Sequence, residues 1–347
     1  MKALVLHAVG DMRLEERPNP RPAAEQVLVR VAFCGVCGSD IPRIFVKGTY
    51  RFPTICGHEF SGTVESLGAG VDAFKRGDKV TAFPLLWCGK CPACEQGRYA
   101  QCSAYDYLGS RSDGAFAEYV VAPARNLLKL PPNVALEEGA MTEPAAVALH
   151  ALRRSGVSPG ESVAIYGAGP IGLLVAQWAR IMGAGQVLLV DLVPERLALG
   201  ARLGFSQLLN ARDRDVVKEI ISLTHGLGAA VCVEAAGVAA TFKAALASAA
   251  CGGRVVLLGN PCGGVTLPAA LISQAMRKEV CIYGTWNSDF RASQGLDDWR
   301  AALGAAASGA LQLRPLITHK LPLERAWEGL KMMREQKEFF AKVLLQP

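Results

Sequence analysis

Four cysteines lie within fifteen residues of this chain, in the stretch CGKCPACEQGRYAQC. Thiolates at the spacing C-x2-C-x2-C-x7-C can form disulfides, a redox pair, an iron–sulfur cluster or a zinc site. The first residues, MKALVLHAVGDMRLEERP, alternate like a strand and lack the apolar run that directs secretion. We therefore expect a cytoplasmic protein, in which metal sites are favoured over disulfides.

A second set of candidate ligands is spread along the chain: Cys37 in CGVCGSD, His58 in CGHEF and Glu143 in TEPAA. Each residue alone is explained as well by a buried thiol, a core histidine or a capping glutamate. Together they offer a thiolate, an imidazole and a carboxylate, and three protein ligands leave a fourth tetrahedral position on zinc for water or substrate. Zinc lowers the pKa of a bound water from about 15.7 to about 7, and an alcohol in its place becomes a hydride donor. The set predicts a catalytic zinc.

A hydride donor needs an acceptor, and the stretch GAGPIG has the spacing of a dinucleotide-binding loop. It follows the apolar run SVAIY and precedes a helical pattern, PIGLLVAQWARIMGA. The first glycine permits a tight turn, the second lets the backbone approach a pyrophosphate, and the third brings helix and strand together. The alternative is a unit without nucleotide whose glycines serve packing alone. The cofactor-binding residues predicted in this loop are Gly167, Gly169, Pro170, Ile171 and Gly172.

An acidic residue, Asp191, ends the next apolar run, QVLLVD, about twenty residues beyond the glycines. Its carboxylate can accept hydrogen bonds from both ribose hydroxyls and repels a 2′-phosphate, so NAD is predicted over NADP. Arg196 is a nearby group that could accommodate such a phosphate. We expect it instead to stack beside the adenine or to face solvent.

With a catalytic zinc expected elsewhere, the cysteine quartet is free to form a closed site of four thiolates. Such a set suits zinc or iron, and hydride transfer does not require the single-electron path of an iron cluster. We therefore predict a structural zinc that shapes a polar, glycine-containing loop. Its ligands are Cys88, Cys91, Cys94 and Cys102. The other cysteines are expected to be packing residues: Cys34, Cys56, Cys232, Cys251, Cys262 and Cys281.

Two kinds of structure must position these groups. Up to about residue 152 the chain has short alternating apolar runs punctuated by Gly and Pro, which predicts an antiparallel β domain. From residue 157 strand patterns alternate with helical ones, which predicts a parallel sheet covered by helices. After residue 285 we expect a helix around 297–307 and a last strand in AKVLLQP that returns to the first domain.

Composition narrows the function classes. A length of 347 residues suits two domains, and 51% hydrophobic with 20% charged residues is typical of a globular protein with a large interior. No apolar run is long enough for a membrane span. The net charge of +6 is spread along the chain without clusters of basic and aromatic residues, so nucleic-acid binding is not expected. A small anionic ligand would be favoured.

The motifs occur in a specific order: CGVCGSD, GHEFSGTVESLGAGV, GDKV, the cysteine quartet, GAFAEYV, EPAAVALHAL and GAGPIG. In this order they resemble the zinc-containing medium-chain dehydrogenase/reductase family over essentially the full chain. The resemblance implies a two-domain α/β fold: a GroES-like catalytic β domain over 1–152, a Rossmann domain with a doubly wound parallel sheet over 153–285, and a C-terminal segment, 286–347, that completes the catalytic domain. It also implies two zinc ions per chain and assembly into homodimers or homotetramers.

The resemblance extends to single residues. Glu143 stands where alcohol dehydrogenases of the family have a second cysteine, which is similar to the polyol dehydrogenase branch. Glu59 matches a carboxylate that lies beside the catalytic zinc and replaces another ligand transiently. Ser39 matches the hydroxyl that takes the alcohol's proton and passes it to the cofactor ribose. Pro42 replaces the histidine with which many relatives continue this relay, so the proton must leave through water or another residue.

Three stretches, CGSDIPRIF, FPLLWCGKCPACEQGRYAQC and YDYLGSRSDGAFAEYVV, resemble polyol-phosphate dehydrogenases of that branch. This implies oxidation of galactitol 1-phosphate to tagatose 6-phosphate with NAD. A phosphate needs cationic or N–H donors. The substrate-contacting candidates are Arg43, Lys47, Arg111, Trp286 and Asn287. Two alternatives stay open: the same chemistry on a free polyol (sorbitol, L-iditol or galactitol) or a vicinal diol, and a non-enzymatic zinc-binding structural or partner-binding protein.

Overall fold

The alternating apolar runs of the first part of the chain form antiparallel sheets in the computed structural model, which describes residues 1–292 and 295–347. These sheets belong to a compact unit made of residues 1–143, 289–309 and 316–347, here called the β unit. Its strands are β1 (Lys2–Ala8), β2 (Asp11–Glu16), β3 (Gln26–Gly35), β4 (Thr54–Ile55), β5 (Glu59–Leu67), β6 (Lys79–Ala82), β7 (Leu85–Leu86), β8 (Asp106–Tyr107), β9 (Tyr119–Pro123), β10 (Leu127–Lys129), β17 (Ile317–Pro322) and β18 (Lys342–Gln346).

The largest sheet of the β unit runs in the order β10-β6-β5-β3-β18-β17, with β9 paired to β3. Smaller sheets are formed by β2-β1-β4 and by β7-β8. The helical elements of this unit are short: α1 (Asp40–Pro42), the π turn η1 (Arg43–Lys47), α2 (Pro92–Glu95), α3 (Leu136–Gly139), α10 (Asp298–Ala307) and α11 (Ala326–Glu335), with 3₁₀ turns at Tyr99–Gln101, Ala124–Asn126 and Leu323–Arg325.

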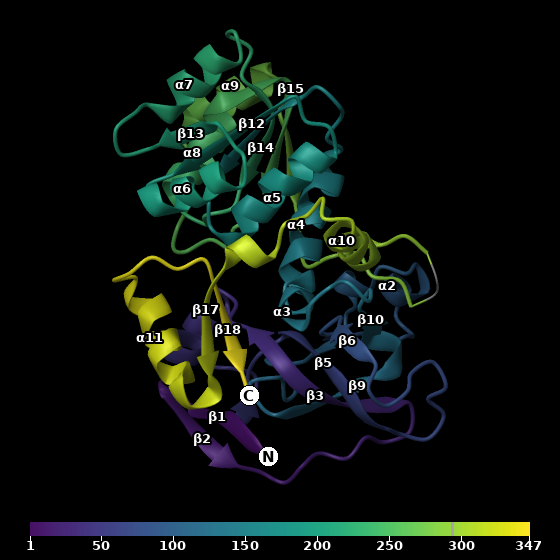
Figure 1. Cartoon of the computed structure of the whole chain (residues 1–347). Coiled ribbons are helices and arrows are strands. Elements are labelled where there is room, and N and C mark those ends of the chain that lie inside the picture. The colour runs from purple at the N-terminus through teal and green to yellow at the C-terminus, as the bar shows by residue number, and fades with distance from the viewer. Residues whose placement is uncertain (293–294) are drawn as a thin grey trace. The chain divides into compact units, whose positions relative to one another are not determined.

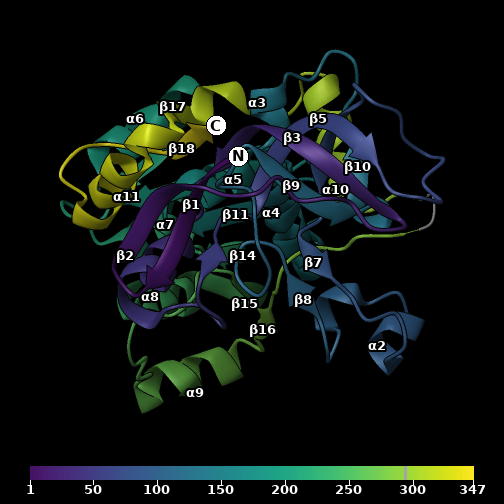
Figure 2. The same ribbon diagram turned by 90° about the horizontal axis from the view of Figure 1, so that it is seen from below.

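The two ends of the chain share one core. Leu6 of β1 and Val343 of β18 are fully buried in the same apolar cluster. Figure 2 shows the N-terminal strands β1 and β2 in purple beside the yellow C-terminal elements α11 and β18. Strand β18 pairs with β3, so the last strand of the chain belongs to the main sheet of the β unit.

The second compact unit, here called the parallel-sheet unit, comprises residues 144–288 and 310–315. Its sheet has the strand order β13-β12-β11-β14-β15-β16, and every neighbouring pair is parallel. This is the order of a Rossmann fold, with the reversal at β11. Its strands are β11 (Ser162–Tyr166), β12 (Gln186–Asp191), β13 (Gln207–Asn210), β14 (Ala229–Glu234), β15 (Ala249–Leu257) and β16 (Cys281–Gly284).

Right-handed connections place the helices of this sheet on two faces, because the strand order changes direction after β13. Helices α5 and α6 contact β11, β12 and β13, whereas α7, α8 and α9 pack side by side (Figure 1). Apolar residues of strands and helices form the core, among them Ala164, Val190 and Leu246. The helices are α4 (Thr142–Ser155), which begins in the β unit, α5 (Pro170–Ile181), α6 (Pro194–Arg202), α7 (Val216–Leu223), α8 (Ala239–Ser248) and α9 (Ala269–Arg277), with a 3₁₀ turn at Arg314–Leu316.

The predicted fold class is confirmed, since a mainly antiparallel β unit, with β17 parallel to β18, and a Rossmann sheet are both present. The domain boundaries expected at residues 152 and 285 stay a prediction about independently folding segments. No helix in the described ranges is both long and apolar enough to cross a membrane.

The expectation that the six cysteines outside the ligand sets are packing residues is half wrong. Cys34, Cys56 and Cys232 are buried, but three others are exposed. The exposed ones are Cys251, Cys262 and Cys281. Glycine-rich segments often form turns and the edges of sheets, so cysteines in such segments are exposed more often than those in apolar strands. The last of the three begins β16, which stands at the end of the strand order and has one neighbouring strand among the described residues.

Candidate functional site

Strand register brings the candidate catalytic ligands together in the β unit. Gly35, the last residue of β3, pairs with Glu59, the first residue of β5. Cys37 follows the end of β3 and His58 precedes the start of β5, so the two side chains lie next to each other. One ligand atom each of Cys37, His58 and Glu59 lies within 4.8 Å of the other two. A Cβ at Gly35 would lie 2.3 Å from Glu59 Oε2, so a larger residue there would displace the Glu59 carboxylate. The antiparallel pairing of two neighbouring strands thus builds a potential metal site.

A buried aspartate, Asp40, lies next to the ring of His58. Asp40 is fully buried, and its Oδ2 accepts a hydrogen bond of 3.0 Å from the backbone N–H of Cys37. Its Oδ1 lies 3.7 Å from His58 Nδ1, which is buried and has no hydrogen-bond partner among the residues described. The Arg43 guanidinium donates to the same carboxylate at 2.5 Å. Metal-binding histidines usually present their second nitrogen to a carboxylate in this way, so the surroundings of His58 fit a metal ligand.

Glu59 is paired with a lysine from the far end of the chain. Lys342 Nζ donates to Glu59 Oε2 at 2.5 Å, and both side chains are almost completely buried. Burial lowers the pKa of Lys342, but the charges of Glu59 and Cys37 and the hydrogen bond to Glu59 outweigh it, so the pKa is raised overall. Strand β18 pairs with β3 through Leu344 and Gly35, which carries Lys342 to this position. The pair places a buried ammonium group against the Glu59 carboxylate, next to Cys37 and His58.

Glu143 lies outside the 4.8 Å group but faces it. Its Oε1 accepts a hydrogen bond of 3.5 Å from the Tyr107 hydroxyl, and the Tyr107 ring stands edge-on to the His58 ring with centroids 5.7 Å apart. Burial raises the pKa of Glu143 to about 7, partly opposed by His58. The structure therefore gathers Cys37, His58 and Glu59 more closely than the predicted trio with Glu143.

The predicted relay residues lie at the start of α1. Ser39 is exposed, and its backbone N–H is 3.5 Å from Cys37 Sγ. Pro42 is the last residue of α1, directly before the turn that carries Arg43. The Ser39 hydroxyl does not cap the helix. Ser39 is therefore adjacent to a candidate ligand and accessible to solvent.

These residues fit a zinc ion. A thiolate, an imidazole and a choice of two carboxylates match the ligands zinc accepts, and the unpartnered Nδ1 of His58 is buried against an acid. A closed structural site would instead present four such ligands at short range. Three close ligands and one more distant carboxylate therefore fit a centre with a position open to an exogenous oxygen.

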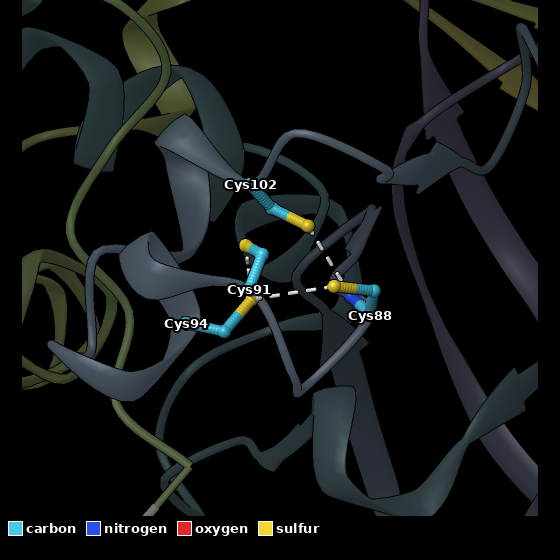
Figure 3. A group of neighbouring side chains, drawn as sticks. All are labelled: Cys88, Cys91, Cys94 and Cys102. Carbon is cyan, nitrogen blue, oxygen red and sulfur yellow. Dashed lines mark hydrogen bonds between the residues drawn. The ribbon is translucent and has the colours of Figure 1, made fainter.

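The cysteine quartet forms a separate cluster around α2 (Figure 3). Its four sulfurs lie within 4.8 Å of one another, with 3.5 Å between Cys91 and Cys94 and 3.9 Å between Cys88 and Cys94. Tetrahedral zinc with Zn–S bonds of about 2.3 Å needs sulfurs about 3.8 Å apart, and a disulfide needs about 2 Å. The remaining ligand, Cys102, accepts a hydrogen bond of 3.3 Å from the N–H of Cys88. The spacing fits a closed metal site.

The thiols of this cluster differ in pKa because their surroundings differ. The N–H groups of Ser103 and Cys94 hold the pKa of Cys91 at about 5, whereas burial raises that of Cys94 to about 12. Trp87, next to Cys88, stacks on Tyr99 with centroids 4.2 Å apart. The quartet is thus fixed within a small lobe that has its own aromatic packing.

The predicted dinucleotide loop joins β11 to α5 in the parallel-sheet unit. Gly167 has φ +107°, which favours glycine, and a Cβ on Gly172 would lie 1.7 Å from Gly167 O. Gly169 is the N-cap of α5, where Pro170 and Ile171 follow. A Cβ on Gly169 would meet no atom of the described chain within 4 Å. Packing therefore explains two of the glycines, and the open space at the third fits a ligand at the helix N-terminus.

Asp191 ends β12 beside this loop. Its Oδ2 accepts a hydrogen bond of 2.7 Å from Ala168 N–H, and its Oδ1 accepts one of 2.9 Å from Val193 N–H. Arg196 Nη1 lies 3.5 Å from Oδ2. The carboxylate is therefore held against the loop, and Arg196 is drawn toward it rather than fully into solvent.

The substrate candidates of the β unit differ in their surroundings. Arg43 is tied to Asp40 behind His58, whereas Lys47 is exposed on the following turn. Arg111 is stacked between two tyrosines. Trp286 and Asn287 belong to the parallel-sheet unit, where Trp286 is 57% exposed and Asn287 has φ +57°.

Three residues of the metal centre escaped the sequence reasoning. Asp40 stands in the motif CGSD, so its place in that motif could have marked it. Tyr107 and Lys342 gave no signal, because a tyrosine in a loop and a lysine in an apolar C-terminal run look ordinary. Only the pairing of strands brings Lys342 to Glu59, which is 283 residues away in the chain.

Comparison with known proteins identifies families whose members bind zinc and oxidise alcohols. Residues 23–132 match the family described as alcohol dehydrogenase GroES-like domain, and residues 170–308 match zinc-binding dehydrogenase. The chain is 36% identical over 321 residues to galactitol 1-phosphate 5-dehydrogenase of Escherichia coli, covering 92% of each protein. It is 32% identical over 354 residues to sorbitol dehydrogenase of Bacillus subtilis, covering 100% of this chain and 97% of that one. The crystal structure of galactitol-1-phosphate dehydrogenase from Escherichia coli superposes with a TM-score of 0.94, at 35% identity and full coverage of both chains.

Proposed function

Because this chain belongs to the zinc-containing medium-chain dehydrogenase family, in its polyol dehydrogenase branch, we propose that it oxidises galactitol 1-phosphate to tagatose 6-phosphate with NAD. Membership makes the protein an oxidoreductase that acts on alcohols or polyols. The observation that carries the proposal is the buried centre of Cys37, His58 and Glu59, backed by Asp40 and Lys342. A scaffold protein would not need to keep these charges buried and balanced.

The residues divide the work at this centre. When bound by Cys37, His58 and one of the two glutamates, zinc supplies Lewis acidity that favours loss of the alcohol's proton. Asp40 orients the His58 ring. The Ser39 hydroxyl, exposed next to Cys37, takes the proton. Since Pro42 cannot carry it further, solvent water completes its exit.

NAD is the proposed hydride acceptor, supported by the open space at Gly169 and by the placement of Asp191. A 2′-phosphate would meet the Asp191 carboxylate, although Arg196 lies within 3.5 Å of it. Dissociation constants for NADH and NADPH, measured by fluorescence titration, test this choice. Tighter binding of NADPH would contradict it.

The proposal includes assembly into a homodimer or homotetramer. Edge strand β16 exposes Ile282, and the neighbouring α9 exposes Ile272 and Met276. Exposed apolar side chains along an unpaired edge are typical of surfaces that pair with another chain. Mass measurement by light scattering after size exclusion tests this, and a monomer at micromolar concentration would contradict it.

The substrate is tested by kcat/KM with NAD for galactitol 1-phosphate, galactitol and sorbitol under the same conditions. We expect the phosphate ester to be preferred by about a hundredfold, because a charge-assisted contact contributes roughly 1.5–3 kcal/mol. If kcat/KM for a free polyol equals or exceeds that for galactitol 1-phosphate, the substrate is a free polyol and not its phosphate. Absence of NAD reduction with all three by zinc-replete protein would reject the substrate class.

A further inference from the structure

The four cations carried by residues 43–51 and by the turn at residues 107–112 differ in what neutralises them. Arg43 donates to the buried Asp40, and Arg51 pairs with Asp113 at 3.1 Å. Lys47 is exposed on a flexible side chain. Arg111, unlike Lys47, is held in place by its neighbours. No carboxylate in the described part of the chain pairs with Arg111.

Two aromatic rings hold Arg111. Its guanidinium carbon lies 4.0 Å from the ring centre of Tyr50 and 4.5 Å from that of Tyr105. Its Nε is buried and has no hydrogen-bond partner among the residues described. A guanidinium fixed by stacking loses little conformational freedom when it binds an anion, and its planar set of donors matches the oxygens of a phosphate.

The turn that carries Arg111 is anchored beside the zinc ligand His58. Gly109 packs on Gly57, the residue before His58, so closely that a Cβ on Gly109 would lie 2.5 Å from Gly57 O. The Arg111 N–H donates to Tyr107 O at 2.9 Å. The arginine is therefore held at a fixed place relative to the metal centre.

Aromatic rings connect the two places. The Tyr107 ring contacts the His58 ring with centroids 5.7 Å apart, and the Tyr105 ring lies edge-on to Tyr107 at 6.4 Å. Arg111 stacks on the outer side of this series, where Tyr50 is 69% exposed. The cation thus stands a short series of side chains away from the metal centre, at an accessible surface.

We propose that Arg111, clamped between Tyr50 and Tyr105, is the subsite that binds the phosphate of an acyclic polyol phosphate while its alcohol reacts at the Cys37–His58 centre. This inference rests on the function proposed above and names the residue that selects its substrate class. Arg43, by contrast, is a positioning residue for Asp40, and Lys47 contributes only general attraction.

The test compares Arg111→Met and Arg111→Lys with the wild-type holoenzyme. Arg51→Met is the matched control, because it removes the same charge from the same region but from an arginine already paired with Asp113. For each protein, kcat/KM with NAD is measured for galactitol 1-phosphate and galactitol, and the dissociation constant of galactitol 1-phosphate is measured by calorimetry. Melting temperature and turnover of galactitol report folding.

We expect Arg111→Met to lower kcat/KM and affinity for galactitol 1-phosphate roughly 10- to 100-fold and to change galactitol turnover less than about twofold. Arg111→Lys should fall between wild type and Arg111→Met, since it keeps the charge but not the planar fork. Arg51→Met should retain the wild-type ratio of the two substrates.

Three results would overturn the subsite. An equal loss for both substrates would make Arg111 a structural residue of the turn. An unchanged ratio in Arg111→Met, with a clear phosphate preference in wild type, would move the subsite elsewhere and leave the proposed function intact. Lack of a phosphate preference in wild type would reject both the subsite and the phosphorylated substrate.

Discussion

The two sulfur-containing sites of the β unit are built on opposite plans. The quartet takes four like ligands from one segment of fifteen residues, and backbone amides lower the pKa of one of them, Cys91. The Cys37–His58 centre takes unlike ligands from separate strands and surrounds them with buried charges, Asp40 and Lys342 among them. The first arrangement would fill all four positions of a tetrahedral metal, and the second would leave one position open.

This difference suits the quartet to a structural role and the Cys37–His58 centre to a catalytic one. A closed set of thiolates offers no position to a substrate, so its contribution is to fold a lobe that is too polar to hold itself. An open set keeps a coordination position free, and the buried charges of Asp40 and Lys342 lie against its ligands. Substitutions in the two sites should therefore have different consequences.

The largest expected effect is on activity. Cys37→Ser or His58→Ala should lower kcat/KM by about a thousandfold or more, because a lost Lewis acid costs several kcal/mol of barrier. Zinc content should fall from two equivalents to one with little change in melting temperature. Steady-state rates, metal analysis and calorimetry of one preparation check this. Substantial residual activity with one zinc would mean that the reaction does not use this centre.

The mirror-image substitution is Cys91→Ser in the quartet. It should also remove one equivalent of zinc but lower the melting temperature by at least about 10 °C, because structural zinc contributes on the order of 10 kcal/mol in small domains. The kcat/KM of the molecules that remain folded should stay within about tenfold of wild type. A stable but inactive variant would erase the distinction between the two sites.

The buried pair of Lys342 and Glu59 should come next. Lys342→Met leaves an unpaired buried carboxylate, which typically costs about 3–5 kcal/mol of stability. Glu59→Gln in the same chain should recover part of that loss, and urea denaturation of the four proteins of this double-mutant cycle gives the coupling energy. Additive effects of the two substitutions would show that the pair is not coupled in solution.

A smaller effect concerns Glu143 in zinc-free protein. Its pKa is raised by burial to about 7, so the neutral form is favoured by folding. The stability it contributes is complete below its unfolded pKa of about 4.5 and is lost as pH rises through about 7. The free energy of unfolding should therefore fall over this range in wild type and fall less in Glu143→Gln. Identical pH profiles from about 5 to about 8 would refute the raised pKa.

Sequence reasoning is most informative where the signal is contiguous. The strand–helix alternation predicted the parallel sheet, which is present. The cysteine quartet and the glycine loop each occupy one short segment, and their roles stay predictions. Sequence reasoning could not find Lys342, because strand pairing and not chain distance decides what meets Glu59. It also could not rank Arg43 and Arg111, since identical side chains differ here only in their partners, a carboxylate or two rings. The exposure of three cysteines was not predicted, because a glycine-rich sequence does not show which strand lies at the edge of a sheet.

The most direct test of the division between the two sites is stepwise removal of zinc with a chelator. Bound zinc is followed by native mass spectrometry, kcat with the preferred polyol by NADH absorbance, and folding by circular dichroism. We predict that activity disappears with the first equivalent lost while the fold persists, and that the fold is lost only with the second. Activity that survives loss of the first equivalent and disappears together with the fold would contradict a separate catalytic centre at Cys37 and His58.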